Sequence, residues 1–172
     1  AVAAITQPPP EGFRAKLERL DSVPRPAGGV AGEGERFVLS HRPNASIAAV
    51  RRALAAGGEV AVARGELEGP AGAETGAFVV SGIESGELDG ILRELGVRAS
   101  AMRTEPEDTQ PLELPRIGLF RPWAASMDEG WTRWLLEQYG FEPVALHNEG
   151  VRAGHLRERF DVIVLADMRP RP

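Results

Sequence analysis

Short apolar runs alternate with amphipathic stretches along this chain from residue 36 onward, and this alternation limits its fold more than any other feature. Runs of about four to eight apolar residues are typical of buried strands, and apolar residues three and four apart are typical of helices. Strands that alternate with helices favour an α/β layer fold, in which each helix returns the chain to the same sheet. We therefore predict a mostly parallel sheet flanked by helices, with one β-hairpin in the N-terminal half.

The bounds of the predicted elements follow from the glycines, prolines and capping residues between these runs. We predict strands at 37–40, 59–64, 77–82, 97–102, 116–120, 141–146 and 160–167. We predict helices from Asn44 or Ser46, as alternative caps, to Ala56, from Glu84 to Leu95, from Met127 to Tyr139 and from Val151 to Arg157. The strands at 59–64 and 77–82 would form the hairpin. The last strand is the most apolar run, which favours a central position in a parallel sheet.

Composition divides the chain into two α/β units between less regular segments. Residues 1–34 are rich in proline and glycine and have few apolar residues to bury, so we predict a tail and linker. An N-terminal unit over 35–103 and a C-terminal unit over 115–168 would be separated by an acidic connector at 104–114. Residues 169–172 form a short C-terminal tail in this division.

Charge and cysteine content exclude several classes of function. Acidic residues outnumber basic ones by 25 to 20, and no cluster of basic residues is present, which argues against a nucleic-acid partner. No apolar run reaches the roughly 18 residues of a membrane span. The sequence contains no cysteine, which excludes disulfides, thiolate metal sites and cysteine nucleophiles. Sequence motifs for a nucleophilic serine or a phosphate-binding loop are also absent.

All three tryptophans lie between residues 120 and 141. Ser126 and Glu129 have the spacing of a capping box, which predicts that a helix begins there. Trp131 and Trp134 share a helical face with other apolar residues, so we predict that they belong to the core. Trp123 follows a predicted strand, where the ligands of α/β sheets bind. For Trp123, Asp128 and Glu129, both a ligand-binding role and a structural role fit the sequence.

The histidines do not form a metal site with their sequence neighbours. His155 and Glu158 have the H-x-x-E spacing of some zinc sites, but no histidine follows them as a third ligand. We interpret this segment as a solvated turn. His41 directly follows a predicted strand, as does His147, which precedes the candidate helix cap Asn148. His41 and Asp167 complete the candidate ligand-binding residues, because each lies at the carboxyl end of a predicted strand. We predict no catalytic residue and no metal ligand in this chain.

The C-terminal unit resembles a region of one known family. The residues that carry this resemblance are Pro122-Trp123, the run M-D-E-G-W-T-R-W at 127–134, Gly140-Phe141, Arg152-Ala153-Gly154 with Leu156, and Phe160-Asp161. Over 115–168, and more loosely over 36–102, the chain is similar to the C-terminal region of large bacterial zinc-carboxypeptidase-like peptidases of the carboxypeptidase A type. In that family a metallopeptidase domain is followed by a domain with a class I glutamine-amidotransferase-like fold.

The resemblance implies a flavodoxin-like, class I glutamine-amidotransferase-like sheet, truncated in this chain. An amidotransferase needs a cysteine nucleophile, which this sequence lacks. The resemblance places zinc only in the peptidase domain, so no cofactor is expected here, and it implies a secreted or periplasmic protein. We expect a fragment of a longer protein, serving as a non-catalytic accessory or binding domain whose partner is the peptidase domain, with a peptide or small molecule as a further ligand.

Two alternatives remain open at the level of sequence. The chain could be a stand-alone small-molecule-binding α/β domain or enzyme that uses the crevice at the carboxyl ends of the strands. His41, Trp123, Asp128 and Asp167 would line that crevice. The chain could instead be a pure interaction domain that buries an apolar face against a neighbour.

Overall fold

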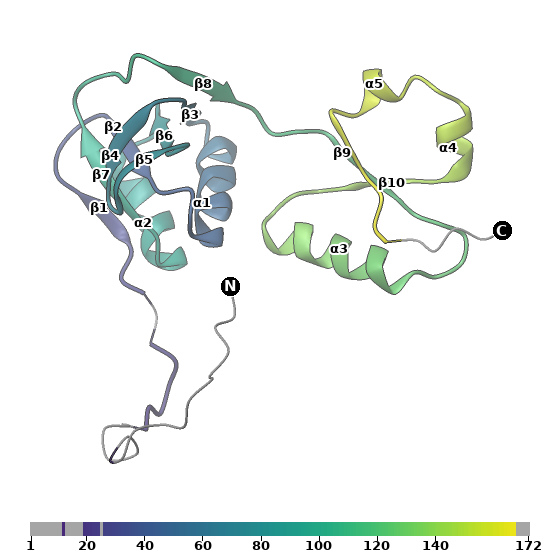
Figure 1. Ribbon diagram of the computed structural model, residues 1–172, viewed down its shortest axis with the longest axis horizontal. Helices are drawn as coiled ribbons and strands as arrows, with labels where there is room; N and C mark the ends of the chain where they lie inside the picture. The colour runs from purple at the N-terminus through teal and green to yellow at the C-terminus, as the bar shows by residue number, and fades with distance from the viewer. Residues whose placement is uncertain (1–11, 13–18, 25, 168–172) are drawn as a thin grey trace.

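A computed structural model describes residues 12, 19–24 and 26–167 of the chain. Figure 1 shows two lobes, each with its own sheet, joined by the segment that follows strand β8. The N-terminal lobe holds a six-stranded sheet and a two-stranded hairpin, and the C-terminal lobe holds a three-stranded sheet. Among the described residues, no helix is long and apolar enough to cross a membrane.

The large sheet is mostly antiparallel. Its strands lie in the order β1-β7-β2-β6-β3-β8, and only the β1–β7 pair is parallel. Their bounds are Gly29–Ala31 (β1), Arg36–Leu39 (β2), Glu59–Ala63 (β3), Phe78–Ser81 (β6), Arg98–Met102 (β7) and Thr109–Leu112 (β8). Helix α1, Asn44–Ala55, connects β2 to β3, and helix α2, Ser85–Leu95, connects β6 to β7. This is the split βαβ arrangement of ferredoxin-like folds, with one strand added at each edge.

The prediction of a mostly parallel, flavodoxin-like or amidotransferase-like sheet is wrong. Strands β2 and β3 point in the same direction, as a βαβ unit requires, but β6 lies between them and is antiparallel to both. Strands and helices alternate along the sequence in the same way whether the two parallel strands are neighbours or have another strand between them. The alternation therefore could not distinguish the two arrangements. The predicted pairing of the second and third strands is confirmed as β3–β6, with Val60 opposite Val80.

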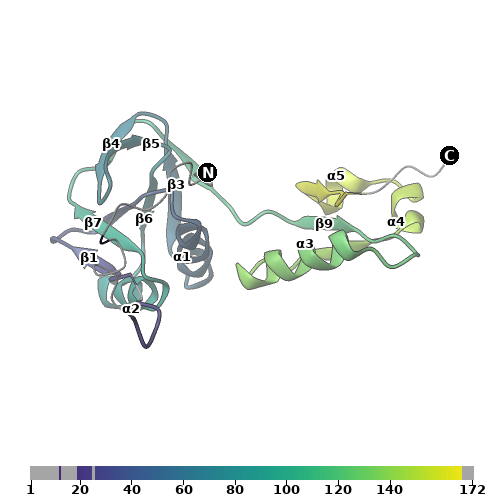
Figure 2. The ribbon, with the colours of Figure 1, turned by 60° about the horizontal axis from the view of Figure 1, so that its bottom comes forward.

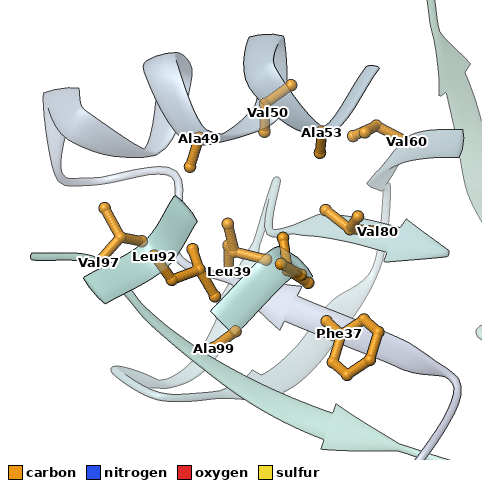
Figure 3. Packing of buried hydrophobic residues seen from close by; sticks show 11 residues of the cluster. Phe37, Leu39, Ala49, Val50, Ala53, Val60, Val80, Leu92, Val97 and Ala99 are labelled. Carbon is orange, nitrogen blue, oxygen red and sulfur yellow. The ribbon is translucent and has the colours of Figure 1, made fainter. Parts of the chain in front are cut away.

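The main core lies between this sheet and its two helices. Phe37 and Leu39 of β2 point to the same face of the sheet as Val80 of β6 and meet Val50 of α1 and Leu92 of α2 (Figure 3). All five side chains are buried. Removing this much apolar surface from water is the main favourable contribution to the stability of such a layer. The predicted apolar face of the first helix therefore packs as expected at Val50, whereas Ile47 remains partly exposed.

The opposite face of the sheet is covered by a hairpin that the sequence analysis missed. Strands β4, Glu66–Gly69, and β5, Gly72–Thr75, pair antiparallel in the segment between the two predicted hairpin strands. Val38, which points away from the helices, is buried with Ala63 and Ala77, and Leu67 of β4 packs against them. Strand β2 is thus buried on both of its faces.

Both edge strands of the large sheet were also missed. Strand β1 lies in the segment predicted as a tail, and β8 lies in the predicted acidic connector. Strand β8 contains Pro111, which an edge strand tolerates because one side of its backbone has no partner strand. The predicted tail at 169–172 lies outside the described residues, and Leu20 of the predicted N-terminal linker is exposed without regular structure.

Glycines end the two long helices of this lobe, as predicted. Gly96 adopts a left-handed conformation with φ 67° after α2, and the Val97 amide donates to the Leu92 carbonyl at 2.9 Å. Helix α1 ends at Gly57 and Gly58 through a similar bond from Gly58 to Ala53. The predicted caps at the start of α1 are wrong, because Pro43 occupies the cap position and no side chain caps the helix.

The C-terminal lobe holds the only sheet of the described residues in which every pair of strands is parallel. Its strands are β9 (Ile117–Phe120), β10 (Val144–Leu146) and β11 (Val162–Val164), in the order β10-β9-β11. Its helices are α3 (Met127–Gln138), α4 (Asn148–Arg152) and α5 (Leu156–Arg159). The predicted last helix is two short ones, and β11 lies at an edge, not in the centre. Figure 2 shows α3 running along one side of this sheet.

The central strand β9 depends on a glycine. A Cβ atom added at Gly118 would lie 3.1 Å from ring atoms of Phe160, which is buried against the strand. We expect Gly118→Ala to destabilise the protein by about 1–3 kcal/mol, because the buried ring or the strand must shift to admit the added methyl group. Urea denaturation followed by tryptophan fluorescence measures this change.

Gly130 provides the matched control. It lies in α3, and a Cβ atom there would meet nothing within 4 Å. Gly130→Ala should leave stability unchanged or raise it by up to about 1 kcal/mol, since alanine has the higher helix propensity. Equal effects of the two substitutions would contradict the packing argument.

Candidate functional site

Parallel strands place three loops at one edge of the small sheet. The segments after β9, β10 and β11 begin at Arg121, His147 and Leu165 respectively. The chain passes from β9 to β10 on one side and then to β11 on the other, which creates a switch point at the carboxyl ends of the strands. Open α/β sheets bind their ligands outside such an edge.

An aromatic pair occupies this edge. Trp123 and His147 stack with ring centroids 5.7 Å apart and an interplanar angle of 28°. His147 Nδ1 lies 2.9 Å from the Arg121 carbonyl oxygen, so the Nδ1–H donates to it and Nε2 is left for another partner. Trp123 has 77% of its surface exposed. The pair is therefore a flat, accessible platform with a polar rim.

Helix α3 begins at the predicted capping residue Ser126, but the Glu129 side chain does not complete the predicted capping box. The Ser126 hydroxyl accepts from the Glu129 amide at 3.3 Å, which is one half of a capping box. The Glu129 carboxylate instead accepts from Arg133: Glu129 Oε1 lies 2.6 Å from Arg133 Nη2 and 2.9 Å from Arg133 Nε. Arg133 also donates to the Pro143 carbonyl, so this pair ties α3 to the segment before β10. Glu129 is only 8% exposed, and its position supports a structural role.

The apolar face of α3 lies in solvent. Trp131 and Trp134 are 62% and 51% exposed, and their rings meet edge to face with centroids 5.7 Å apart. Met127 and Leu135, on the same face of the helix, are also exposed. The prediction that the two tryptophans belong to the core is wrong. The side of α3 toward β10 carries the charged pair Glu129–Arg133 instead.

The remaining predicted site residues do not come together. Asp128 is exposed in the first turn of α3, and Asp167 is exposed beyond β11. His41 belongs to the other lobe, where it follows β2. Its Nδ1 lies 3.7 Å from Glu74 Oε2. Neither residue belongs to the Trp123 platform. The crevice predicted from His41, Trp123, Asp128 and Asp167 thus draws on two separate lobes.

His41 adjoins a buried carboxylate that the sequence analysis missed. Glu74 Oε2 accepts from the Ser40 hydroxyl at 3.0 Å and pairs with Arg42 Nε at 3.1 Å. Glu74 Oε1 is buried and has no hydrogen-bond partner among the described residues. The sequence carried no signal for this carboxylate, because β5 reads G-A-E-T without apolar alternation and only the structure shows that Glu74 is buried.

His155 and Glu158 form an exposed pair. His155 Nδ1 lies 3.1 Å from Glu158 Oε1, and the His155 backbone is left-handed with φ 54°. No group of three or more histidine, aspartate or glutamate side chains that could hold a metal ion occurs within residues 19–24 and 26–167.

The opposite edge of the small sheet is held by a bidentate ion pair. Arg116 Nε and an outer guanidinium nitrogen lie 3.0 Å and 2.8 Å from the two oxygens of Asp161, and the Arg116 amide also donates to Asp161 at 2.8 Å. These contacts from Arg116 lower the pKa of Asp161 to about 2. The pair joins the residues directly before β9 and β11. It therefore fixes the amino ends of both strands, away from the Trp123 platform.

Comparison of the chain with protein-family models, with curated proteins and with solved structures gives no match in any of the three. The resemblance to zinc-carboxypeptidase-like peptidases therefore stays a prediction from the sequence motifs.

The Arg116–Asp161 pair makes the stability of the protein depend on pH. The pKa of Asp161 is lower in the folded state than in the unfolded state, so its contribution is complete above the ordinary value of 3.8 and is lost as the pH falls toward about 2. We expect the difference in unfolding free energy between the wild type and Asp161→Asn to shrink over this range. Urea denaturation at several pH values measures it.

The exposed Asp167 serves as the control, and Asp167→Asn should give the wild-type profile. A constant difference between the wild type and Asp161→Asn at all pH values would contradict the role of ionised Asp161.

The two acidic residues at the start of α3 should differ in their effect on stability. Glu129→Gln removes the charge that holds Arg133, and we expect a loss of about 1–3 kcal/mol. Asp128→Asn removes an exposed charge near the helix amino end and should cost less than about 1 kcal/mol. Thermal and urea denaturation of both variants check the order, and an equal loss would contradict a structural role for Glu129.

Proposed function

We propose that this chain is a non-catalytic accessory module that docks onto the peptidase domain of a zinc-carboxypeptidase-like protein. The observation that carries the proposal is the exposed apolar face of α3, formed by Met127, Trp131, Trp134 and Leu135. We call these four residues the α3 face. Contiguous apolar patches are uncommon on soluble monomers and mark sites of protein contact.

The chemistry of the α3 face suits a protein partner. Its residues occupy positions i, i+4, i+7 and i+8 of one helix, which form a single stripe. Tryptophans are enriched among the residues that contribute most to binding energy at protein interfaces. The helix is held in place from its other side by the Glu129–Arg133 pair and the Pro143 carbonyl. The tryptophans are thus presented on a fixed helix.

The choice of partner rests on the motif that the α3 face shares with the family. The M-D-E-G-W-T-R-W run contributes both Trp131 and Trp134, and it is the most specific part of the similarity to zinc-carboxypeptidase-like peptidases. The absence of cysteine from the sequence supports a non-catalytic role, because it removes every cysteine nucleophile. The proposal places any zinc in the peptidase domain and the protein in a secreted or periplasmic location.

The Trp123–His147 platform supports a second candidate function. An exposed indole stacked on an imidazole can bind a planar or sugar-like small molecule, and the edge of the sheet where it lies is a common ligand site. This candidate involves different residues from the α3 face, so variants can distinguish the two.

The docking proposal is tested with the zinc-carboxypeptidase-like domain that we expect in the same reading frame. Calorimetric titration of this domain with the present chain should show binding, and Trp131→Ala should weaken it at least tenfold, an effect typical of a central interface tryptophan (about 1.4 kcal/mol or more). Circular dichroism confirms that each variant folds. Hydrolysis of a blocked peptide by the present chain alone, with zinc added, should not occur.

Trp123→Ala is the matched control, since it removes an equally exposed tryptophan outside the α3 face. It should leave docking unchanged. Docking that depends on Trp123 and not on Trp131 would contradict the role of the α3 face. The absence of such a domain from the reading frame, or hydrolysis by the isolated chain, would overturn the proposal.

A further inference from the structure

Strand β11 forms an open edge of the small sheet. It pairs with β9 on one side, and no strand of the described residues pairs with its other side. Val162 and Ile163 point to opposite faces of the sheet, and both are exposed, as is Leu165 directly after the strand. This edge therefore presents unpaired backbone groups together with apolar side chains.

The other edge strands of the two larger sheets carry features that discourage a further strand. Strand β8 contains Pro111, and Pro143 directly precedes β10. Proline has no amide to donate and is one of the residues that protect exposed edges. On β1 the Val30 amide donates to the Asp89 carboxylate at 2.9 Å. Residues 162–165 read V-I-V-L, without proline or charge, so β11 is the edge best suited to accept another strand.

Two charged residues flank this edge symmetrically. Arg159 and Asp167 each lie four residues from Ile163, on opposite sides of it along the chain. Both are exposed, and neither forms an ion pair with a residue that the structure describes. The Arg159 guanidinium lies over the Phe160 ring, 4.9 Å from its centroid, which leaves its charge without a carboxylate. The nearer charge, Asp161, is already held by Arg116.

A second copy of the same strand complements this pattern of charges. In an antiparallel pair with a two-fold axis at Ile163, that residue faces its own copy, and Arg159 of each chain comes opposite Asp167 of the other. Such a pair forms twice, once at each end of the strands. An axis at Val164 would instead bring Asp161 opposite Asp167, and like charges in this position are unfavourable. The charges therefore favour one register of self-pairing.

We propose that β11 pairs antiparallel with β11 of a second copy of this chain, which joins the two small sheets into one six-stranded sheet. The two-fold symmetry closes the assembly at two copies. Parallel sheets that carry an antiparallel strand are common in α/β proteins. None of the residues of the α3 face takes part, so this proposal does not depend on the docking proposal.

The test measures the association of the full chain by sedimentation equilibrium over about 1 μM to 1 mM. We expect a monomer–dimer equilibrium without larger species. Arg159→Asp and Asp167→Arg should each weaken dimerisation about tenfold, because symmetry creates two like-charge pairs from each substitution. The double variant should dimerise as the wild type does, because it restores both pairs with the charges exchanged. A folding defect would not be rescued in this way, and circular dichroism checks each variant.

Ile163→Cys provides an independent readout, since the sequence has no cysteine of its own. Residue 163 of one copy lies opposite residue 163 of the other in the proposed register, so mild oxidation should join two chains by a disulfide. Val144→Cys is the matched control, because Val144 is exposed on the other edge strand of the same sheet and should not cross-link.

Four results would each overturn the proposal. The chain could remain monomeric over the whole concentration range, or its dimer could be lost in Trp131→Ala, which would place the interface on the α3 face. The charge reversals could leave dimerisation unchanged, or the double variant could fail to restore it. Equal cross-linking of Ile163→Cys and Val144→Cys would also contradict pairing through β11.

Discussion

Burial of strand β2 on both faces is the constraint on which the N-terminal lobe depends. Phe37 and Leu39 need the two helices on one side, and Val38 needs the β4–β5 hairpin on the other. Strands β6 and β7 pair on either side of β2, so its backbone hydrogen bonds are satisfied at both edges as well. Because β6 runs antiparallel between β2 and β3, the helix after β2 skips one strand position, and the split arrangement follows.

The strands of the C-terminal lobe are less completely buried than β2. Its central strand β9 is buried at Ile117 and Leu119, with Phe160 packed against Gly118. Its flanking strands nevertheless leave Val144 and Val162 exposed, and α3 carries its charged pair toward the strands and its tryptophans toward solvent. A helix with two tryptophans in solvent lacks the apolar burial that usually stabilises a helix, unless another surface covers them. The docking proposal supplies that surface.

The sequence predicted the elements of this fold better than their arrangement. The strands and long helices appear within a few residues of their predicted bounds, because apolar periodicity and glycine stops are local signals. Strand order is a property of distant pairs, and the alternation of strands and helices does not record that β6 enters between β2 and β3. Strands β1, β4, β5 and β8 were missed since glycine, proline and acidic residues dominate them, which is common for edge strands and hairpins.

The candidate sites were also difficult to predict from the sequence, because they join residues that are distant along the chain. Trp123 could be predicted at a strand end, but its partner His147 lies on the next strand, and only parallel pairing brings the two rings together. Glu74 meets Ser40 across a separation of 34 residues, so no motif connects them. The platform and the buried Glu74 carboxylate belong to different lobes and share no residue. The two lobes also meet outside the segment that joins β8 to β9, because Arg51 of α1 lies 4.0 Å from Glu142, so a change in one lobe can reach the other through this contact as well as along the chain.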